Sequence, residues 1–319
     1  MNLLEERDYY KPFNYPWAFE YYKQQQHMHW LPDEVNLADD LRDYRDKMSE
    51  GNKRLLGQIF RFFTQADVDV CCGYAKHYLP TFKQPEVRMM LSAFAAMEAV
   101  HQEAYSLLLE TLGFSDDEYQ KFFEHKEMLD KHEYLSNFGM GTPIDIAKTM
   151  AIYSGFTEGV QLFSSFAILL NFPRHNLMKG MGQIVTWSVR DESLHVEGMS
   201  HLFRAFIQEN PELWTDDLKY EIYCAAERTV ELEDAFIDLC FTGAEVPNLT
   251  AEEVKEYIRY IADRRLLGLG MKKIFGSDAN PLPWLDYMLN GVEHTNFFEN
   301  RATEYSRAST TGNWQDIFK

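Results

Sequence analysis

The sequence predicts an all-α fold, and three observations support this. Ala, Leu, Met, Glu and Lys, which favour helices, dominate residues 40–290, where alternating β-branched residues are scarce. Residue pairs with the spacing of helix-start caps recur: Ser115 with Glu118, Thr142 with Pro143, and Thr250 with Glu253. Four segments are far longer than the mean helix of about 11–12 residues: 52–79, 85–112, 143–170 and 177–208. We expect these four segments to form a central helical bundle.

Composition and charge limit the possible functions. The 319 residues are 45% hydrophobic and 25% charged, as in ordinary globular proteins, and no Pro/Gly/Ser-rich linker or repeat divides them before the tail. The 31 basic and 50 acidic residues give a net charge of −19, which disfavours binding to nucleic acids or anionic membranes. The four cysteines form no CxxC pair, and the first residues lack the apolar core of a signal peptide. We therefore expect one domain in a reducing cytoplasm.

The segment Ala147–Leu170 is apolar enough to be weighed as a membrane span, since about 20 residues suffice for one. Glu158 and Gln161 lie in its middle, however, and no basic flank orients it. Because a helix that is apolar all round is equally suited to the interior of a bundle, we expect this segment to be buried in protein.

Two of the long segments carry the same Glu-x-x-His motif. Glu98 and His101 lie in an otherwise apolar stretch, and Glu192 and His195 repeat the spacing in the run TWSVRDESLHVEG. Side chains three residues apart are neighbours on a helix surface, so each pair can converge on one point. One such motif is weak evidence, but two motifs on separate long helices are more informative.

The other two long segments each place an acid among apolar residues, Asp67 and Glu158. Buried carboxylates are costly without compensating charge, which divalent metal ions supply. One carboxylate from each of two helices plus Glu-x-x-His from the other two is the ligand set of dinuclear iron or manganese sites in ferritin-like bundles. Oxygen and imidazole ligands without thiolates suit these metals. The sequence therefore predicts a ferritin-like bundle with a dinuclear metal site in its four central helices.

A simpler interpretation treats these residues as structural. Glu98 and Glu192 would then pair with arginines such as Arg88 or Arg190, and the histidines would be ordinary core residues. For either motif alone we favour this interpretation, but it must explain four acids in four apolar surroundings independently, so we favour metal for the whole set. Asp69 points to another helix face than Asp67 and is the weaker ligand candidate. Six further histidines lie in polar or terminal stretches and are expected at the surface: His27, His29, His125, His132, His175 and His294.

Three residues near the predicted site have side chains suited to electron transfer or its support. Tyr105 lies one helical turn beyond His101 in apolar surroundings, where a phenol can act as a shielded one-electron donor as well as a core residue. Asp191 precedes Glu192 and can accept a hydrogen bond from a ligating histidine or from the indole of Trp30.

In these residues the chain resembles the radical-generating small (β) subunit of class I ribonucleotide reductase over essentially its whole length. The matching segments are WLPDEV at 30–35, Asp67, EAVH followed by Tyr105, TEGVQLF around Glu158, RDESLH at 190–195 and NFFENRATEY at 296–305. The resemblance implies a ribonucleoside-diphosphate reductase subunit that is active only with its large subunit, in the reduction of ribonucleotides to deoxyribonucleotides.

The resemblance also implies residue roles. Asp67, Glu98 and His101 would hold one metal, and Glu158, Glu192 and His195 the other. The metals are expected to be two irons first, with dimanganese or manganese–iron as alternatives, activated by dioxygen or superoxide. The oxidant would be a tyrosyl radical at Tyr105, beside Leu162, Phe166 and Ser188, or the metal cluster itself. Trp30, Asp191 and Tyr305 would carry the oxidising equivalent to the large subunit.

For assembly, the resemblance implies a homodimer, with residues 1–298 as the di-metal domain and 299–319 as a flexible tail that docks on the large subunit, anchored by Trp314 and Phe318. Two other classes stay open: a stand-alone ferritin-like di-metal oxidase, which would not need Tyr305 or the tail, and a scaffold or iron-storage protein.

Overall fold

The computed structural model describes residues 2–135 and 139–289. The chain divides into two compact units, Met1–Pro281 and Leu282–Lys319. Of the second unit the described residues include a helical stretch at 283–289. The predicted tail, with Tyr305, Trp314 and Phe318, lies outside the described residues, so the boundary at residue 298 stays a prediction.

The first unit is helical throughout its described secondary structure, which confirms the all-α prediction. Its elements are α1 (Pro16–His27), η1 (Pro32–Glu34), α2 (Ala38–Asp46), α3 (Glu50–Gly73), η2 (Tyr74–Tyr78), α4 (Leu79–Thr81), α5 (Pro85–Leu112), α6 (Asp117–Gln120), η3 (Lys121–Glu124), α7 (Lys126–Leu135), α8 (Pro143–Thr149), η4 (Met150–Gln161), α9 (Phe163–Arg174), α10 (Lys179–Glu209), η5 (Pro211–Leu213), α11 (Asp216–Phe241) and α12 (Ala251–Gly268).

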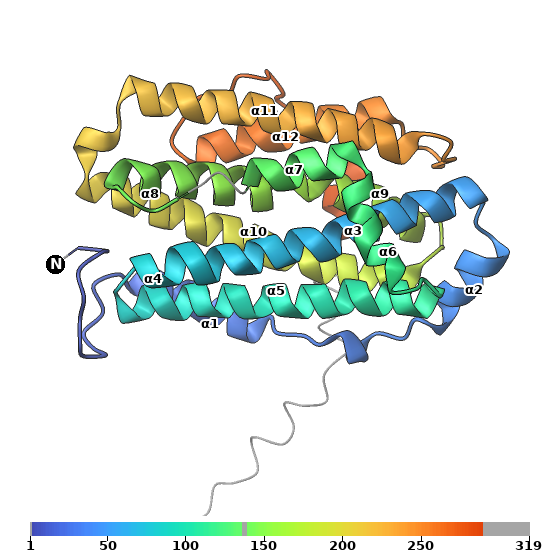
Figure 1. Cartoon of the computed structure of the whole chain (residues 1–319), viewed down its shortest axis with the longest axis horizontal. Helices are drawn as coiled ribbons and strands as arrows, with labels where there is room; N and C mark the ends of the chain where they lie inside the picture. Colours follow the sequence, from blue (N-terminus) through green and yellow to red (C-terminus); the bar gives the residue numbers. More distant parts are fainter. Residues whose placement is uncertain (1, 136–138, 290–319) are drawn as a thin grey trace, which may run out of the picture. The chain divides into compact units, whose positions relative to one another are not determined.

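Four long helical stretches form the centre, as the sequence predicts: α3 with η2, α5, the continuous run α8–η4–α9, and α10. In Figure 1, α3 and α5 lie side by side, and α11 and α12 cover the side of the bundle opposite to α5. The segments η2 and η4 are π-helical, which the sequence did not predict. A π-helix is rare and is found mostly as a single turn at a functional site. The twelve π-helical residues of η4 therefore indicate that the stretch around Glu158 belongs to a functional site.

Helix starts follow the predicted caps where side chains are described. Thr142 and Thr250 each accept the N–H three residues on and complete a capping box. The helix after Ser115 begins at Asp117, and the side chain of Glu118 lies outside the described residues.

The apolar segment around η4 lies inside the bundle. Every residue of Met150–Gln161 is buried, as expected for the interior of a protein. Within residues 2–135 and 139–289, no helix combines the length and the hydropathy that crossing a membrane requires.

The N-terminal residues fasten α1 to the bundle through one buried carboxylate. Glu86 at the start of α5 pairs with Arg7 at 2.5 Å and also accepts the backbone N–H groups of Asn14 at 2.7 Å and Tyr15 at 2.9 Å. Both side chains of the ion pair are at most 1% exposed. These bonds fix the beginning of α1, whose later residues reach the centre of the bundle.

Replacing Glu86 by Gln should destabilise the fold strongly. The change leaves the charge of Arg7 buried without a partner, which costs about 3–5 kcal/mol. Urea unfolding should show this loss in the free energy of unfolding, while Glu231→Gln, which removes an exposed pair with Arg228, should cost less than about 1 kcal/mol. Equal losses in the two variants would contradict the role given to Glu86.

Candidate metal centre

The structure brings the six predicted ligands together from all four central stretches. Each is at most 1% exposed: Asp67 on α3, Glu98 and His101 on α5, Glu158 on η4, and Glu192 and His195 on α10. The long helices place them by local geometry, because each Glu-x-x-His motif presents both side chains on one face of its helix.

The two glutamates of these motifs lie between the two histidines. Nδ1 of His101 is 3.5 Å from Oε2 of Glu98 and 3.1 Å from Oε1 of Glu192. Nδ1 of His195 is 2.9 Å from Oε1 of Glu98 and 3.7 Å from Oε2 of Glu192. Each carboxylate therefore turns one oxygen to each histidine, so both glutamates would be placed to help hold metal ions beside either histidine.

The ligand atoms fall into two overlapping groups, each within 4.8 Å. One contains Asp67, Glu98, His101 and Glu192, and the other contains Glu158, Glu192 and His195. The grouping agrees with the division between two metals that the family resemblance implies, with Glu192 shared.

Many of these buried polar atoms have no hydrogen-bond partner among the described residues. They are Oδ2 of Asp67, both oxygens of Glu98, Oε1 of Glu158, Oε2 of Glu192, and Nδ1 of both histidines. An orphaned buried polar atom costs about 1–3 kcal/mol, so a cluster of them that all face inward calls for a ligand. Carboxylate and imidazole donors without thiolate fit a pair of divalent first-row metal ions.

The arginine pairs of the simpler interpretation do not form. Glu98 and Glu192 have only histidines as ion-pair partners within the described part of the chain, and Arg88 donates to the carbonyl of Phe82 instead.

The charges shift each other's protonation. Burial raises the pKa of Asp67 and of Glu158 well above the ordinary value, and the neighbouring glutamates add to this. Burial opposes the charge of Glu192 too, but the two facing imidazoles outweigh it and lower its pKa to about 2. Burial by itself would lower the pKa of His195, but the facing carboxylates raise it to about 10. Without metal the site therefore holds protons that cations would replace.

Comparison with known proteins agrees with this geometry. The family model described as "Ribonucleotide reductase, small chain" matches residues 7–281. A probable ribonucleoside-diphosphate reductase small subunit of Invertebrate iridescent virus 3 is 46% identical, over 98% of this chain and 88% of that protein. The β subunit of Chlamydia pneumoniae is 32% identical, over 93% and 89%. The chain belongs to the ribonucleotide reductase small-chain family. It is a class I small subunit and part of an oxidoreductase.

The fold also matches a solved structure. The dimanganese(II) protein NrdF of Streptococcus sanguinis superposes with a TM-score of 0.75, at 24% identity, over 88% of this chain and all of that one. This likeness supports the ferritin-like bundle.

Behind the ligands of this small subunit runs a chain of hydrogen bonds. Oδ2 of Asp191 accepts from Nε1 of Trp30 at 2.7 Å and lies 3.3 Å from Nε2 of His101. Oδ1 of Asp191 accepts from the amide of Gln25 at 3.2 Å, and Oε1 of Gln25 lies 3.0 Å from Nε2 of His195. Both histidines can therefore donate outward through Nε2, which leaves Nδ1 for a metal. Asp191 thus makes contacts with Trp30 and His101 that the sequence analysis considered. Gln25 lies in a polar stretch whose sequence pattern did not indicate a role at the site.

Two further residues that the sequence did not indicate contact Glu158 or the residue after it. The hydroxyl of Tyr74, on η2, donates to Oε2 of Glu158 at 3.1 Å, and Nε of Arg265, on α12, donates to the carbonyl of Gly159 at 2.8 Å. Both residues contact the π-helical segment η4 from other elements of the fold. The local sequence around each of them therefore does not indicate the contact.

The predicted radical residue, Tyr105, is 1% exposed and stacks on Phe63 at 4.5 Å between ring centroids. Burial and then the charge of Asp67 raise its pKa. Its hydroxyl oxygen has no hydrogen-bond partner within the described residues. The nearby hydroxyl of Ser188 opposes the rise of the Tyr105 pKa. The hydroxyl of Ser188 donates to the carbonyl of Ile184 at 3.1 Å.

Asp69 is occupied elsewhere, in line with its lower rank as a ligand. Its Oδ2 lies 2.6 Å from Nδ1 of His132, and its carbonyl accepts from Tyr153. His132, expected at the surface, is half-buried against this partner on α3.

The metal-free protein should lose stability as pH rises from about 6.5 to about 10. The pKa of His195 is raised on folding to about 10, so its contribution is complete below about 6.5 and is lost through this window; His101 acts in the same direction. Urea unfolding across the window should show the fall, and metal loading should abolish it, because metal ions replace the protons. A flat profile without metal would contradict the assignment.

Gln25→Ala should weaken metal binding at the His195 half of the site. Loss of an outer hydrogen-bond partner of a ligating histidine costs about 10–100-fold in affinity. Competition of Mn(II) between the protein and a chelator measures this, with Gln24→Ala, an exposed neighbour on α1, as the control. Unchanged affinity in Gln25→Ala would show that Asp191 alone orients the site.

Proposed function

We propose that Asp67, Glu98, His101, Glu158, Glu192 and His195 hold a dinuclear metal centre with which this small subunit generates the oxidant used by a large subunit. The observation that carries the proposal is the placement of Glu98 and Glu192 between the two histidine Nδ1 atoms. Two bound metal ions would supply one-electron oxidation of the protein at the expense of dioxygen or superoxide. Two irons are our first choice, with dimanganese or manganese–iron as alternatives, since the donor set accepts both elements.

We propose Tyr105 as the site of a stored radical. Its burial excludes water and external reductants, and the flat ring of Phe63 and the side chain of Phe166 beyond it, whose ring lies 5.1 Å from that of Phe63, isolate it in apolar surroundings. The phenol oxygen has no hydrogen-bond partner within the described residues, and the hydroxyl of nearby Ser188 donates to the carbonyl of Ile184.

The proposed electron path begins at His101 and passes through Asp191 to Trp30. Asp191 holds the indole N–H at 2.7 Å, so it can keep or take that proton while the ring changes its charge. The rings of Trp30 and His101 stack at 5.9 Å. Beyond Trp30 we propose Tyr305 as the relay and residues 299–319 as the segment that docks on the large subunit.

Assembly and location are also proposals. We propose a homodimer, as the family resemblance implies, that contacts neither nucleic acid nor membrane. The four cysteines are free thiols, which suits a reducing cytoplasm. A stand-alone oxidase is the alternative, and it would not depend on the tail.

Tyr105→Phe should abolish a tyrosyl radical signal while the metal content stays unchanged, because the change leaves all six proposed ligands in place. Low-temperature EPR with parallel metal analysis, on protein loaded separately with iron and with manganese and exposed to dioxygen or superoxide, makes the measurement. Full activity of Tyr105→Phe with the large subunit would place the oxidant on the metals.

Tyr305→Phe should keep metal and radical but lose turnover with the large subunit by at least about 100-fold, because a phenylalanine cannot give up a proton with its electron. Ribonucleotide reduction with the large subunit measures this, and Tyr287→Phe, an exposed tyrosine, is the control. Full turnover of Tyr305→Phe would exclude this relay. Activity of a protein truncated after residue 300 on a substrate of its own would favour the stand-alone oxidase.

A further inference from the structure

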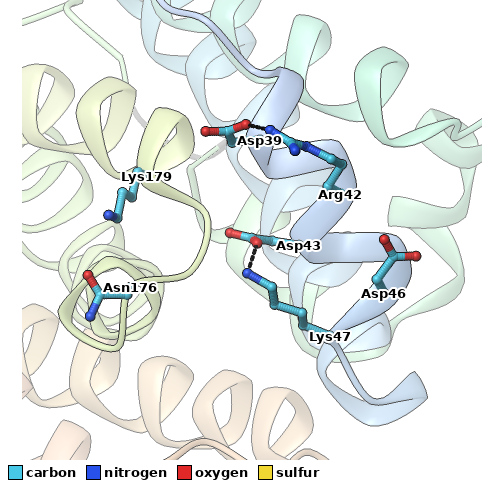
Figure 2. A pocket seen from close by; sticks show the side chains of 7 residues that line it. All are labelled: Asp39, Arg42, Asp43, Asp46, Lys47, Asn176 and Lys179. Atoms are coloured by element: carbon cyan, nitrogen blue, oxygen red, sulfur yellow. Dashed lines mark hydrogen bonds and ion pairs between the residues drawn. The ribbon is translucent and has the colours of Figure 1, made fainter.

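Two surface pockets contain cationic side chains, but their cations are paired differently. The first, of about 400 Å³, lies between α2 and the start of α10. Figure 2 shows Arg42 beside Asp39 and Lys47 beside Asp43 on α2, and the second pair is 2.6 Å apart. Asp43 also accepts the N–H of Met178. This pocket neutralises its charges internally.

The second pocket, of about 220 Å³, lies between α10 and α12. Its lining includes three arginines, Arg204, Arg264 and Arg265, and one acid, Glu197. In the described part of the chain none of these arginines has an acidic ion-pair partner, although acids outnumber bases 50 to 31 in the sequence.

The hydrogen bonds of these arginines go to neutral oxygens. Arg204 donates to the carbonyl of Gly268, Arg264 to the hydroxyl of Tyr260 at 3.2 Å, and Arg265 to the carbonyl of Gly159 at 2.8 Å. A guanidinium has five N–H donors, so each arginine retains donors beyond these bonds. The three positive charges therefore face a single acid of the lining, Glu197.

The acid of the pocket is engaged with a tyrosine. Burial and then Glu197 raise the pKa of Tyr21 to about 12, so this carboxylate acts on the phenol of α1. Arg265 is packed on the ring of Phe163 at 4.8 Å, and burial, with Arg264 adding to it, lowers its pKa to about 10. The pocket therefore carries a net positive charge, three arginines against one acid, which an anion would balance.

We propose that the pocket between α10 and α12 binds a small oxyanion, phosphate or carboxylate in chemistry, through Arg204, Arg264 and Arg265. Guanidinium groups match the paired oxygens of both anions. The volume of about 220 Å³ is below the roughly 300–1,000 Å³ of pockets for drug-sized ligands, which favours a small ion over a whole nucleotide. Two of the residues concerned are next in sequence to proposed ligands: Gly159, which Arg265 contacts, follows Glu158, and the lining residue Val196 follows His195.

Calorimetric titration of the full-length protein with inorganic phosphate, at constant ionic strength, tests the proposal. We expect saturable binding with a Kd of about 1 mM, the same for metal-free and metal-loaded protein. Arg264→Gln and Arg204→Gln should each weaken binding at least about tenfold, as loss of a charged hydrogen bond predicts, and Arg264→Lys should weaken it less. Arg42→Gln, in the charge-balanced pocket, should bind as the wild type does.

Three results would overturn the proposal. The first is that phosphate shows no saturable binding. The second is that Arg264→Gln, with a native circular dichroism spectrum, binds phosphate as tightly as the wild type, and the third is that only metal-loaded protein binds phosphate. Parallel titrations with sulfate and acetate distinguish the sources. Tighter binding of phosphate and sulfate indicates a free tetrahedral anion, and tighter binding of acetate indicates a carboxylate from a peptide or metabolite.

Discussion

The burial of four carboxylates and two imidazoles at one point is the constraint on which the rest of the structure depends. The four acids carry four negative charges when ionised, and two divalent ions carry four positive ones, so two bound ions would neutralise the carboxylates. Protons achieve only part of this, as the opposed pKa shifts of Glu192 and Glu158 indicate. Four helices with long apolar faces are the simplest way to hold such a cluster away from water.

The layer around the ligands makes the two halves of the centre unequal. His101 is backed by the carboxylate of Asp191, whereas His195 is backed by the neutral amide of Gln25. A carboxylate partner increases the electron donation of an imidazole more than an amide does. Gln25 belongs to α1, which Glu86 fastens to α5 through Arg7. The N-terminal residues thus contribute to the electronic character of a site to which they supply no ligand.

The sequence predicted what depends on local spacing and failed where distant elements meet. Helical periodicity located all four central segments, and the i, i+3 spacing of Glu98 with His101 predicted a shared face that the structure shows. The choice of Asp67 over Asp69 also followed from helix geometry. Gln25 and Arg265 lie more than 100 residues from the partners they bond, so no spacing could indicate them. The π-helical winding of η4 escaped prediction because its residues are as apolar as those of an α-helix.

That winding explains why elements outside the central four matter to the site. A π-helix shifts backbone hydrogen bonds out of the usual register, and at its end carbonyls need other donors. Arg265 of α12 supplies one at Gly159, and Lys131 of α7 supplies another at Gln161, 3.2 Å away. Lys131 is itself balanced by the buried Glu233 of α11 at 2.5 Å. A buried cation needs such a partner, so α7, α11 and α12 together support η4, and with it the segment that carries Glu158.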